Sequence, residues 1–442
     1  MIDYFHMFPN SDFKKGTFYQ QSQYKQQLDK ARFAGYKTYV NEVRKINNIR
    51  LANRYSGKIK IQDILMACWK DFKIKYAKKL TREGVVKAVE DSIDCGTFTK
   101  GFAYYECPKC GEFHVQSFTC KSRFCSSCGK KYSDERSVEV SKKLLDIPHR
   151  QFVFTLPPDM RDLFRKHRYL LNVLFQSSYE CIYRYLYNNS NSKYIREGRQ
   201  IGMISFIHTF GRDLKWHPHI HALVPERYVR KDGSIGKYSY FHYDCIRIMF
   251  RNIVCKNTYD YISQHFSSEK NEVYRLIKRM KKKYDKGFYI YGPQMNNCSL
   301  TGMKELTNYV ARYASHPPLS ENRITKFNRE AKTVEWFYDP HEDDLQEDEE
   351  KLIGRQFINE SVDSFLSKLL IHIPDKGFQQ IRYYGFYSNK TKSEPKKRKL
   401  FCKKEINKMS SLLKWENALL NVYGYTPLIC SCGTRMELKP NL

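Results

Sequence analysis

Two closely spaced pairs of cysteines constrain the fold of this chain more than any other feature of its sequence. Each pair has the form Cys-x-x-Cys, and fourteen residues lie between the pairs, whose members are Cys107, Cys110, Cys125 and Cys128. Each pair turns two thiolates toward one point, and two pairs complete the tetrahedral four-sulfur shell that Zn²⁺ prefers in structural sites. The pattern therefore predicts a zinc ribbon with these four cysteines as its ligands.

Two further cysteines leave this ligand set open. Cys95 and Cys120 lie in the same stretch, so they are candidates for extra or alternative zinc ligands, and buried free thiols are the other interpretation. The chain has 14 cysteines among 442 residues, which is too sparse for a disulfide scaffold. Six of them fall between residues 95 and 128, and such clustering in a reducing compartment favours metal binding.

The charge balance indicates a polyanionic partner. Lysine and arginine number 77 against 47 aspartates and glutamates, which gives a formal net charge of +30. A balance this basic is typical of proteins that bind nucleic acid, and a membrane surface is the less favoured alternative. Within the cysteine-rich stretch we expect a cationic face that contacts DNA phosphates, built from Lys121, Arg123, Lys130 and Lys131.

Composition excludes several classes of protein. Hydrophobic residues make up 41% of the chain and aromatic residues 15%, which is too high for a disordered or collagen-like polymer. The sequence has no apolar run of about eighteen residues that could span a bilayer and no apolar leader. We therefore expect a folded, soluble, cytoplasmic protein.

Hydrophobic periodicity predicts an α+β protein. Apolar residues at helical spacing predict two helices within 61–92 and single helices at 161–187, 244–265, 272–283, 302–314, 363–372 and 405–422. Alternating runs predict strands at 151–156, 201–210, 218–224, 287–291, 323–327, 334–338 and 380–384. The expected division is an N-terminal arm (1–60), a helical and zinc-ribbon domain (61–140), a central domain (141–340), and an acidic linker with a C-terminal α/β region (341–442).

A run of alternating histidines, His217-Pro-His219-Ile-His221, lies in the second strand of a predicted hairpin. Alternate side chains of a strand share one face, so His219 and His221 project together while Ile220 turns into the core. Two imidazoles on one face can hold a divalent metal and leave positions open for substrate oxygens. The alternative is a ladder of structural histidines.

His208, in the first strand of the same hairpin, is the candidate third ligand. If the hairpin turns near residues 214–215, His208 lies opposite His221 on the same face. A slip of one residue in register would point it to the other face.

Tyr309 and Tyr313 are four residues apart in a predicted helix, so both lie on one face of it. Spacing alone does not separate this pair from aromatic core, because three other tyrosine pairs share it: Tyr179/Tyr183, Tyr183/Tyr187 and Tyr383/Tyr387.

Several motifs in a fixed order give the chain a family resemblance. They are Cys95-Gly-Thr, Cys107-Pro-Lys-Cys-Gly111, Phe118-Thr-Cys-Lys-Ser-Arg-Phe-Cys-Ser-Ser-Cys-Gly129, Phe152-Val-Phe-Thr-Leu-Pro157, His208-Thr-Phe-Gly-Arg-Asp-Leu214, His217-Pro-His-Ile-His-Ala-Leu-Val224, Tyr309-Val-Ala-Arg-Tyr313 and Ile381-Arg-Tyr-Tyr-Gly385. Over about residues 60–440 the chain resembles the transposases of the IS91 family, a branch of the HUH single-strand endonucleases.

The resemblance implies a zinc-binding N-terminal domain followed, over 141–340, by an HUH nuclease domain with a central antiparallel, ferredoxin-like sheet flanked by helices. His219 and His221 match the HUH pair, and Tyr309 and Tyr313 match the two-tyrosine signature. Arg312, between the tyrosines, becomes a candidate DNA contact. The implied location is the nucleoid of a bacterium or archaeon.

The implied reaction is cleavage of one DNA strand, which leaves a 5′-phosphotyrosine and a free 3′-hydroxyl, followed by rejoining to another strand in a rolling-circle-like transposition. The expected partner is DNA, as single-stranded or hairpin transposon ends. A tyrosine phenol, with a pKa of about 10, is a poor nucleophile at neutral pH, and a histidine-held Mg²⁺ or Mn²⁺ would assist it. No P-loop is present, and this route needs no nucleotide cofactor.

The chain departs from the family pattern near its end, where Cys430-Ser-Cys432-Gly is one residue shorter than the usual Cys-x-x-Cys-Gly. A Cys-x-Cys pair is strained as a chelator, so the sequence does not decide whether a second zinc binds there. Two alternative functions remain. One is a replication initiator or relaxase with the same chemistry, and the other is a non-catalytic zinc-ribbon DNA-binding regulator.

Overall fold

The computed structural model describes most of the chain between residues 59 and 439. The described ranges are 59–188, 199–292, 299–300, 309–310, 313, 317–340, 354–388 and 428–439, apart from residues 83, 98, 99, 142, 146, 231, 233, 239 and 240. The predicted arm up to residue 58, the acidic stretch 342–351 and the predicted helix 405–422 lie outside these ranges.

A six-stranded antiparallel sheet forms the centre of the molecule. Its order is β13-β4-β5-β3-β8, and β9 also pairs with β3. The strands are β3 (His149–Thr155), β4 (Gly202–Phe210), β5 (Trp216–Pro225), β8 (Ile290–Tyr291), β9 (Ser299–Leu300) and β13 (Ile381–Gly385). Every residue of β5 is buried, because the strand lies between two others and both of its faces are covered.

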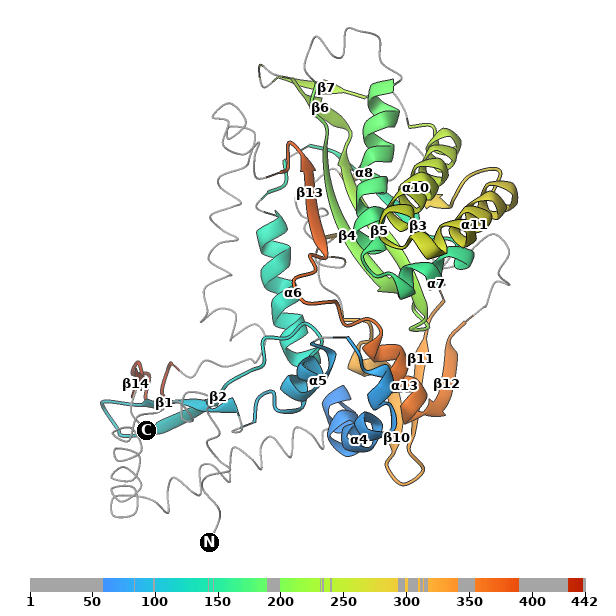
Figure 1. Ribbon diagram of the computed structural model, residues 1–442. Coiled ribbons are helices and arrows are strands. Elements are labelled where there is room, and N and C mark those ends of the chain that lie inside the picture. Colours follow the sequence, from blue (N-terminus) through green and yellow to red (C-terminus); the bar gives the residue numbers. More distant parts are fainter. Residues whose placement is uncertain are drawn as a thin grey trace.

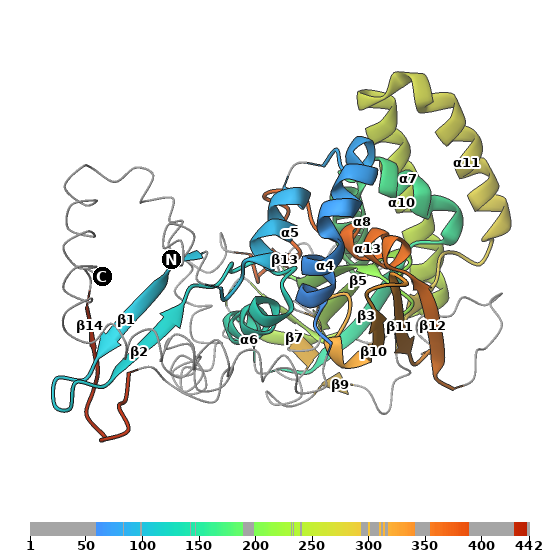
Figure 2. The ribbon, with the colours of Figure 1, turned by 90° about the horizontal axis from the view of Figure 1, so that it is seen from below.

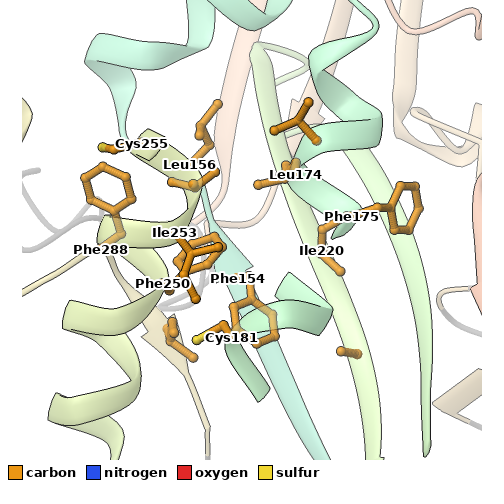
Figure 3. Close-up of a cluster of buried hydrophobic side chains, with 14 of the residues drawn as sticks. Phe154, Leu156, Leu174, Phe175, Cys181, Ile220, Phe250, Ile253, Cys255 and Phe288 are labelled. Carbon is orange, nitrogen blue, oxygen red and sulfur yellow. The ribbon is translucent and has the colours of Figure 1, made fainter. Parts of the chain in front are cut away.

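Three helices pack against one face of this sheet, and a fourth, α11, packs on the outer side of α10 (Figure 1). They are α7 (Pro158–Lys166), α8 (Leu170–Asn188), α10 (Tyr243–His265) and α11 (Lys270–Lys283). Figure 3 shows Phe154 of β3 and Ile220 of β5 facing the helix side chains Leu174 and Phe250, and the Phe154 and Phe250 rings meet edge to face at 5.0 Å. Burial of each such side chain contributes about 1.5–3 kcal/mol. This core gives the sheet a rigid backing.

A second core joins the N-terminal helices to segments far along the chain. It contains α4 (Ile61–Lys75), α5 (Val85–Ile93), β10 (Ile324–Asn328), β11 (Thr333–Tyr338), β12 (Gln356–Ser361) and α13 (Val362–Leu370). Trp336 and Phe365 are fully buried at its centre, with ring centroids 6.4 Å apart. Ile61 N also donates to Glu321 Oε1. The start of the described chain is therefore fixed by contacts with residues some 250 positions later.

A smaller sheet projects from one side of the molecule in both ribbon views (Figures 1 and 2). It has the order β14-β1-β2, with β1 (Phe102–Glu106), β2 (Phe113–Ser117) and β14 (Glu437–Leu438). The long helix α6 (Ser126–Ser141) connects this side to the central sheet. A separate two-stranded sheet pairs β6 (Arg227–Val229) with β7 (Ile235–Lys237).

The mixed helix and antiparallel-sheet architecture confirms the coarse fold prediction, and the predicted hairpin at 201–210 and 218–224 is confirmed as β4–β5. The single helix predicted at 161–187 is wrong, because α7 ends at Lys166 and α8 begins at Leu170. His167 leaves helical geometry there, and its Nε2 lies 2.8 Å from Glu269 Oε2. The four-part division of the chain stays a prediction. Among the described helices, none is long and apolar enough to cross a membrane.

Two buried histidines outside the hairpin act as neutral hydrogen-bonding groups. His149 donates from Nδ1 to Ile147 O (2.7 Å) and accepts at Nε2 from the Tyr387 hydroxyl (2.5 Å). His372 donates from Nε2 to Leu214 O (3.0 Å) and accepts at Nδ1 from Thr209 Oγ1 (3.1 Å). Burial lowers the pKa of each of these histidines from 6.5 to about 4.

We expect acid to destabilise the protein through these histidines. Between pH 6.5 and 4 the unfolded chain binds more protons than the folded one, so the free energy of unfolding falls as the pH falls, by at most about 1.4 kcal/mol per pH unit for each histidine. The His149→Gln variant should therefore lose less stability between pH 7 and 5 than the wild type, as measured by urea unfolding. His265→Gln, at an exposed position of α10, is the control. Equal pH slopes in His149→Gln and wild type would contradict this account.

Candidate metal centres and active site

The β4–β5 hairpin brings three histidines together on one face of the central sheet. His208, His219 and His221 each offer a ring nitrogen, and these nitrogens all lie within 4.8 Å of one another. The ring centroid of His221 is 4.8 Å from that of His208 and 4.8 Å from that of His219. The structure thus places all three predicted ligands at one point.

The hairpin register differs from the predicted one by two residues. His208 pairs with His219, whereas His221 pairs with Phe206. The chain turns earlier than predicted, within residues 211–215, where Gly211 N donates to Lys215 O, and the register shifts between His208 and Phe210. Because the difference is two residues, His208 stays on the predicted face.

Hydrogen bonds fix the protonation of two of these rings. His219 donates from Nδ1 to His217 O (2.8 Å), and His208 donates from Nε2 to Tyr313 O (3.1 Å). Each ring therefore keeps a lone pair on its other nitrogen, which is the arrangement found in histidines that bind metals. Within the described part of the chain, the buried Nδ1 of His221 has no hydrogen-bond partner.

Burial keeps the imidazoles of His219 and His221 neutral. It lowers the pKa of His219 to about 3 and the pKa of His221 well below 6.5, and in His221 the neighbouring His208 acts in the same direction. Neutral imidazole is the form that coordinates a metal. Three imidazole nitrogens within reach of one point fit a divalent cation and leave its other positions to oxygen ligands.

The two predicted tyrosines differ in their distance from the histidines. The Tyr313 ring lies 4.0 Å from the His221 ring and 5.8 Å from the His208 ring, centroid to centroid. The Tyr309 ring lies 4.5 Å from the Tyr313 ring and is buried in a cluster with Val140 of α6. Tyr313 therefore faces the histidines, and Tyr309 packs behind it. Of the predicted helix 302–314, residues 309, 310 and 313 are described, and they are helical.

A first cysteine cluster forms between the end of α5 and the start of α6, from Cys95, Cys120, Cys125 and Cys128. Cys128 Sγ lies 3.4 Å from Cys95 Sγ and 3.7 Å from Cys120 Sγ. Zinc–sulfur bonds of about 2.3 Å in a tetrahedron place the sulfurs about 3.8 Å apart, so the cluster has nearly the dimensions of a zinc site. The backbone N–H of Cys120 also donates to Cys95 Sγ (3.3 Å), as is common around zinc-bound thiolates.

The zinc ligand set predicted from the two Cys-x-x-Cys pairs is wrong. Cys107 and Cys110 do not join Cys125 and Cys128 but lie in a second cluster, with Cys430 and Cys432. The reason is the β1–β2 hairpin, because its connecting loop carries residues 107–112 away from α6. Cys95 and Cys120, which the sequence left as alternatives, complete the first cluster.

The residues predicted to contact phosphates lie in different environments. Lys121 is exposed, whereas Arg123 is half-buried and donates to Gln380 Oε1 (2.5 Å) and to the Tyr132 hydroxyl. Burial lowers the pKa of Arg123. The side chains of Lys130 and Lys131, and the whole of Arg312, lie outside the described residues.

Arg123 lines an open cleft of about 860 Å³ between α6 and the β13 edge of the sheet. Two further arginines, Arg136 and Arg382, and the aromatic residues Tyr383 and Tyr384 line the same cleft. Cationic and aromatic side chains together suit the backbone and bases of single-stranded nucleic acid. Sequence reasoning missed this cleft because its two walls are some 250 residues apart, although the motif 381–385 contributes to one wall.

Two comparisons with known proteins agree in class. A family model described as "Putative transposase" matches residues 202–395, and the IS91 "Transposase zinc-binding domain" matches residues 64–156. The transposase for insertion sequence element IS801 of Pseudomonas savastanoi pv. phaseolicola is 29% identical over 323 residues, which cover 70% of this chain and 72% of that protein. "Putative transposase y4qJ" of Sinorhizobium fredii is 23% identical over 312 residues, covering 68% and 73%. No solved structure matches the chain.

We expect the histidine cluster to bind Mn²⁺. Removal of one nitrogen ligand in His208→Ala or His219→Ala should weaken Mn²⁺ binding by at least about tenfold. The measurement is an electron paramagnetic resonance titration of free Mn²⁺ against zinc-loaded protein. His265→Ala, which removes an exposed histidine of α10, should leave the affinity unchanged. Equal affinities in all four proteins would show that the histidines do not hold the ion.

Proposed function

Because the chain belongs to the IS91 family of transposases, we propose that it cuts single-stranded DNA at transposon ends and rejoins it through a phosphotyrosine intermediate. The observation that carries this proposal is the position of the Tyr313 ring, whose centroid lies 4.0 Å from that of His221 within the cluster of three histidines. A potential nucleophile thus lies beside the groups that would position a phosphate. The antiparallel central sheet supports an HUH-type nuclease domain around this site.

In the first step, the Tyr313 phenol oxygen attacks the scissile phosphorus. The bond from that oxygen to phosphorus forms as the bond from phosphorus to the 3′ oxygen breaks. The phenol loses one proton and the departing 3′ oxygen gains one, so it leaves as a 3′-hydroxyl. A divalent metal, Mg²⁺ or Mn²⁺, held by His208, His219 and His221 would polarise the phosphate and offset its developing charge. The hydrogen bond from His208 to Tyr313 O orients the backbone that carries the nucleophile.

Tyr309 supplies the second attack. Its ring lies 4.5 Å from that of Tyr313, so a strand held by Tyr313 stays close to Tyr309. Two tyrosines then permit two successive strand transfers, as a rolling-circle-like transposition requires. Each covalent intermediate retains the energy of the broken phosphodiester bond in its tyrosine–phosphate bond, so resealing needs no nucleotide cofactor.

The first cysteine cluster holds a structural zinc that braces the site indirectly. Cys128 lies in the first turn of α6, and Val140 near the other end of that helix packs in the same cluster as Tyr309. A helix of this length spans about 24 Å at about 1.5 Å per residue, so α6 links the zinc site to the tyrosines. The net charge of +30 and the arginine-lined cleft beside α6 support DNA as the partner, in the form of single-stranded or hairpin ends.

The direct test is covalent capture of labelled single-stranded DNA that carries the element's end. With Mn²⁺ present, wild-type protein should retain the label on a denaturing gel. Tyr313→Phe and His219→Ala should lower the rate of adduct formation by at least about a thousandfold, because the first removes the attacking oxygen and the second a metal ligand. Tyr309→Phe should still form the first adduct but fail in strand transfer.

Tyr183→Phe is the matched control, since this tyrosine is exposed on α8 and belongs to a pair with the same spacing. Adduct formation that survives in Tyr313→Phe and disappears in Tyr309→Phe would reverse the order of the two tyrosines. DNA binding that needs neither Mg²⁺ nor Mn²⁺ and gives no adduct would overturn the enzymatic proposal in favour of a non-catalytic zinc-ribbon DNA-binding regulator.

A further inference from the structure

The second cysteine cluster has the dimensions of a closed metal site. Its members are Cys107, Cys110, Cys430 and Cys432, and their sulfurs all lie within 4.8 Å of one another. Cys110 Sγ is 3.4 Å from Cys430 Sγ and 3.7 Å from Cys432 Sγ, and Cys107 Sγ is 3.6 Å from Cys432 Sγ. These separations match the roughly 3.8 Å expected for four sulfurs around one zinc ion.

The backbone around both cysteine pairs has the tight turns that zinc knuckles use. Gly111 has φ +72° and donates from its N–H to Cys107 O (3.0 Å), and Gly433 has φ +78° and donates to Cys430 O (2.9 Å). Positive φ at these two positions favours glycine, and glycine is the residue in both turns. Cys430 N also donates to Thr434 O (2.9 Å), so the turn itself brings the Cys-x-Cys sulfurs to one side. The expected strain of a Cys-x-Cys chelator is thus relieved by the turn.

The β1–β2–β14 sheet buries too few apolar side chains to be stable through apolar packing alone. The β1–β2–β14 sheet projects from the main body (Figure 2), and five residues form its buried cluster: Tyr105, Cys107, Leu428, Cys430 and Met436. β14 pairs with β1 through two register positions, Tyr105 with Leu438 and Glu106 with Glu437. Units with so little core commonly require a disulfide or a metal to fold. The described cysteines here are all free thiols.

We propose that Cys107, Cys110, Cys430 and Cys432 bind a second structural zinc ion, which fastens the C-terminal end of the chain to the β1–β2 hairpin. Each cysteine binds as a thiolate, so loading releases thiol protons. Cys430, now 3.1 Å from Glu112 Oε2, gives up that contact, and Ser431 Oγ remains as the donor to this carboxylate (2.5 Å). The match to the zinc-binding family model ends at residue 156 and does not include Cys430 or Cys432.

Native mass spectrometry of the full chain, purified with zinc, tests this proposal independently of DNA cleavage. Wild-type protein should carry two zinc ions, and the Cys110→Ser/Cys432→Ser double variant should carry one. These two cysteines are exposed, so their replacement disturbs little packing. Cys245→Ser, at an exposed cysteine outside both clusters, should keep two ions.

Hydrogen exchange locates the ion that is lost. In wild-type protein the amides of Cys430 and Met436 donate to Thr434 O and Leu428 O. In the double variant, peptides covering 428–439 should exchange at least about tenfold faster, while peptides from α4 and α5 keep wild-type rates. One zinc in the wild type, two in the double variant, or a mass deficit that shows disulfides in place of the second ion would each overturn the proposal.

Discussion

The antiparallel pairing of β4 with β5 is the interaction on which the rest of the structure depends. It sets His208 beside His219 and leaves His221 on the same face, so a slip of one residue would separate the three imidazoles. The register is fixed by the turn at 211–215, where Leu214 is buried at φ +62° and Asp213 Oδ1 accepts from Lys215 N (3.0 Å). A short loop thus determines the geometry of the whole site, while the surrounding strands and helices keep the site buried.

Local periodicity was sufficient to predict the hairpin and the face on which its histidines lie. The partner of His208 was not predictable, because the register shift after it depends on turn geometry that hydrophobic alternation does not encode. The same limit explains the helix predicted at 161–187, whose apolar spacing continues across a break at His167. That break is held by a contact with Glu269, about a hundred residues away.

The cysteines show that local sequence predicts the two members of a ligand pair but not which pairs share a metal site. The Cys-x-x-Cys spacing correctly indicated that two sulfurs of a pair point to one place, which is a property of a few consecutive residues. It contained no information on which pairs share a site, because that depends on the β1–β2 hairpin and on residues more than 300 positions away. Sequence proximity favoured the pairing of Cys107 with Cys125, whereas the fold brings Cys107 to Cys432.

The proposed metal sites differ in role, because the cysteine clusters would stabilise the fold and the histidine cluster would take part in the chemistry. Thiolate clusters close all four positions of a zinc ion and suit the ends of a scaffold, whereas three imidazoles leave positions for substrate oxygens. His208 connects the histidine cluster to the proposed nucleophile, because its Nε2–H donates to Tyr313 O and its ring also offers a nitrogen to the cluster. That hydrogen bond requires no metal, so Tyr313, the proposed nucleophile, is already positioned before an ion or DNA arrives. In the proposed reaction, preorganisation of this kind would lower the entropic cost of bringing the phenol to the phosphate.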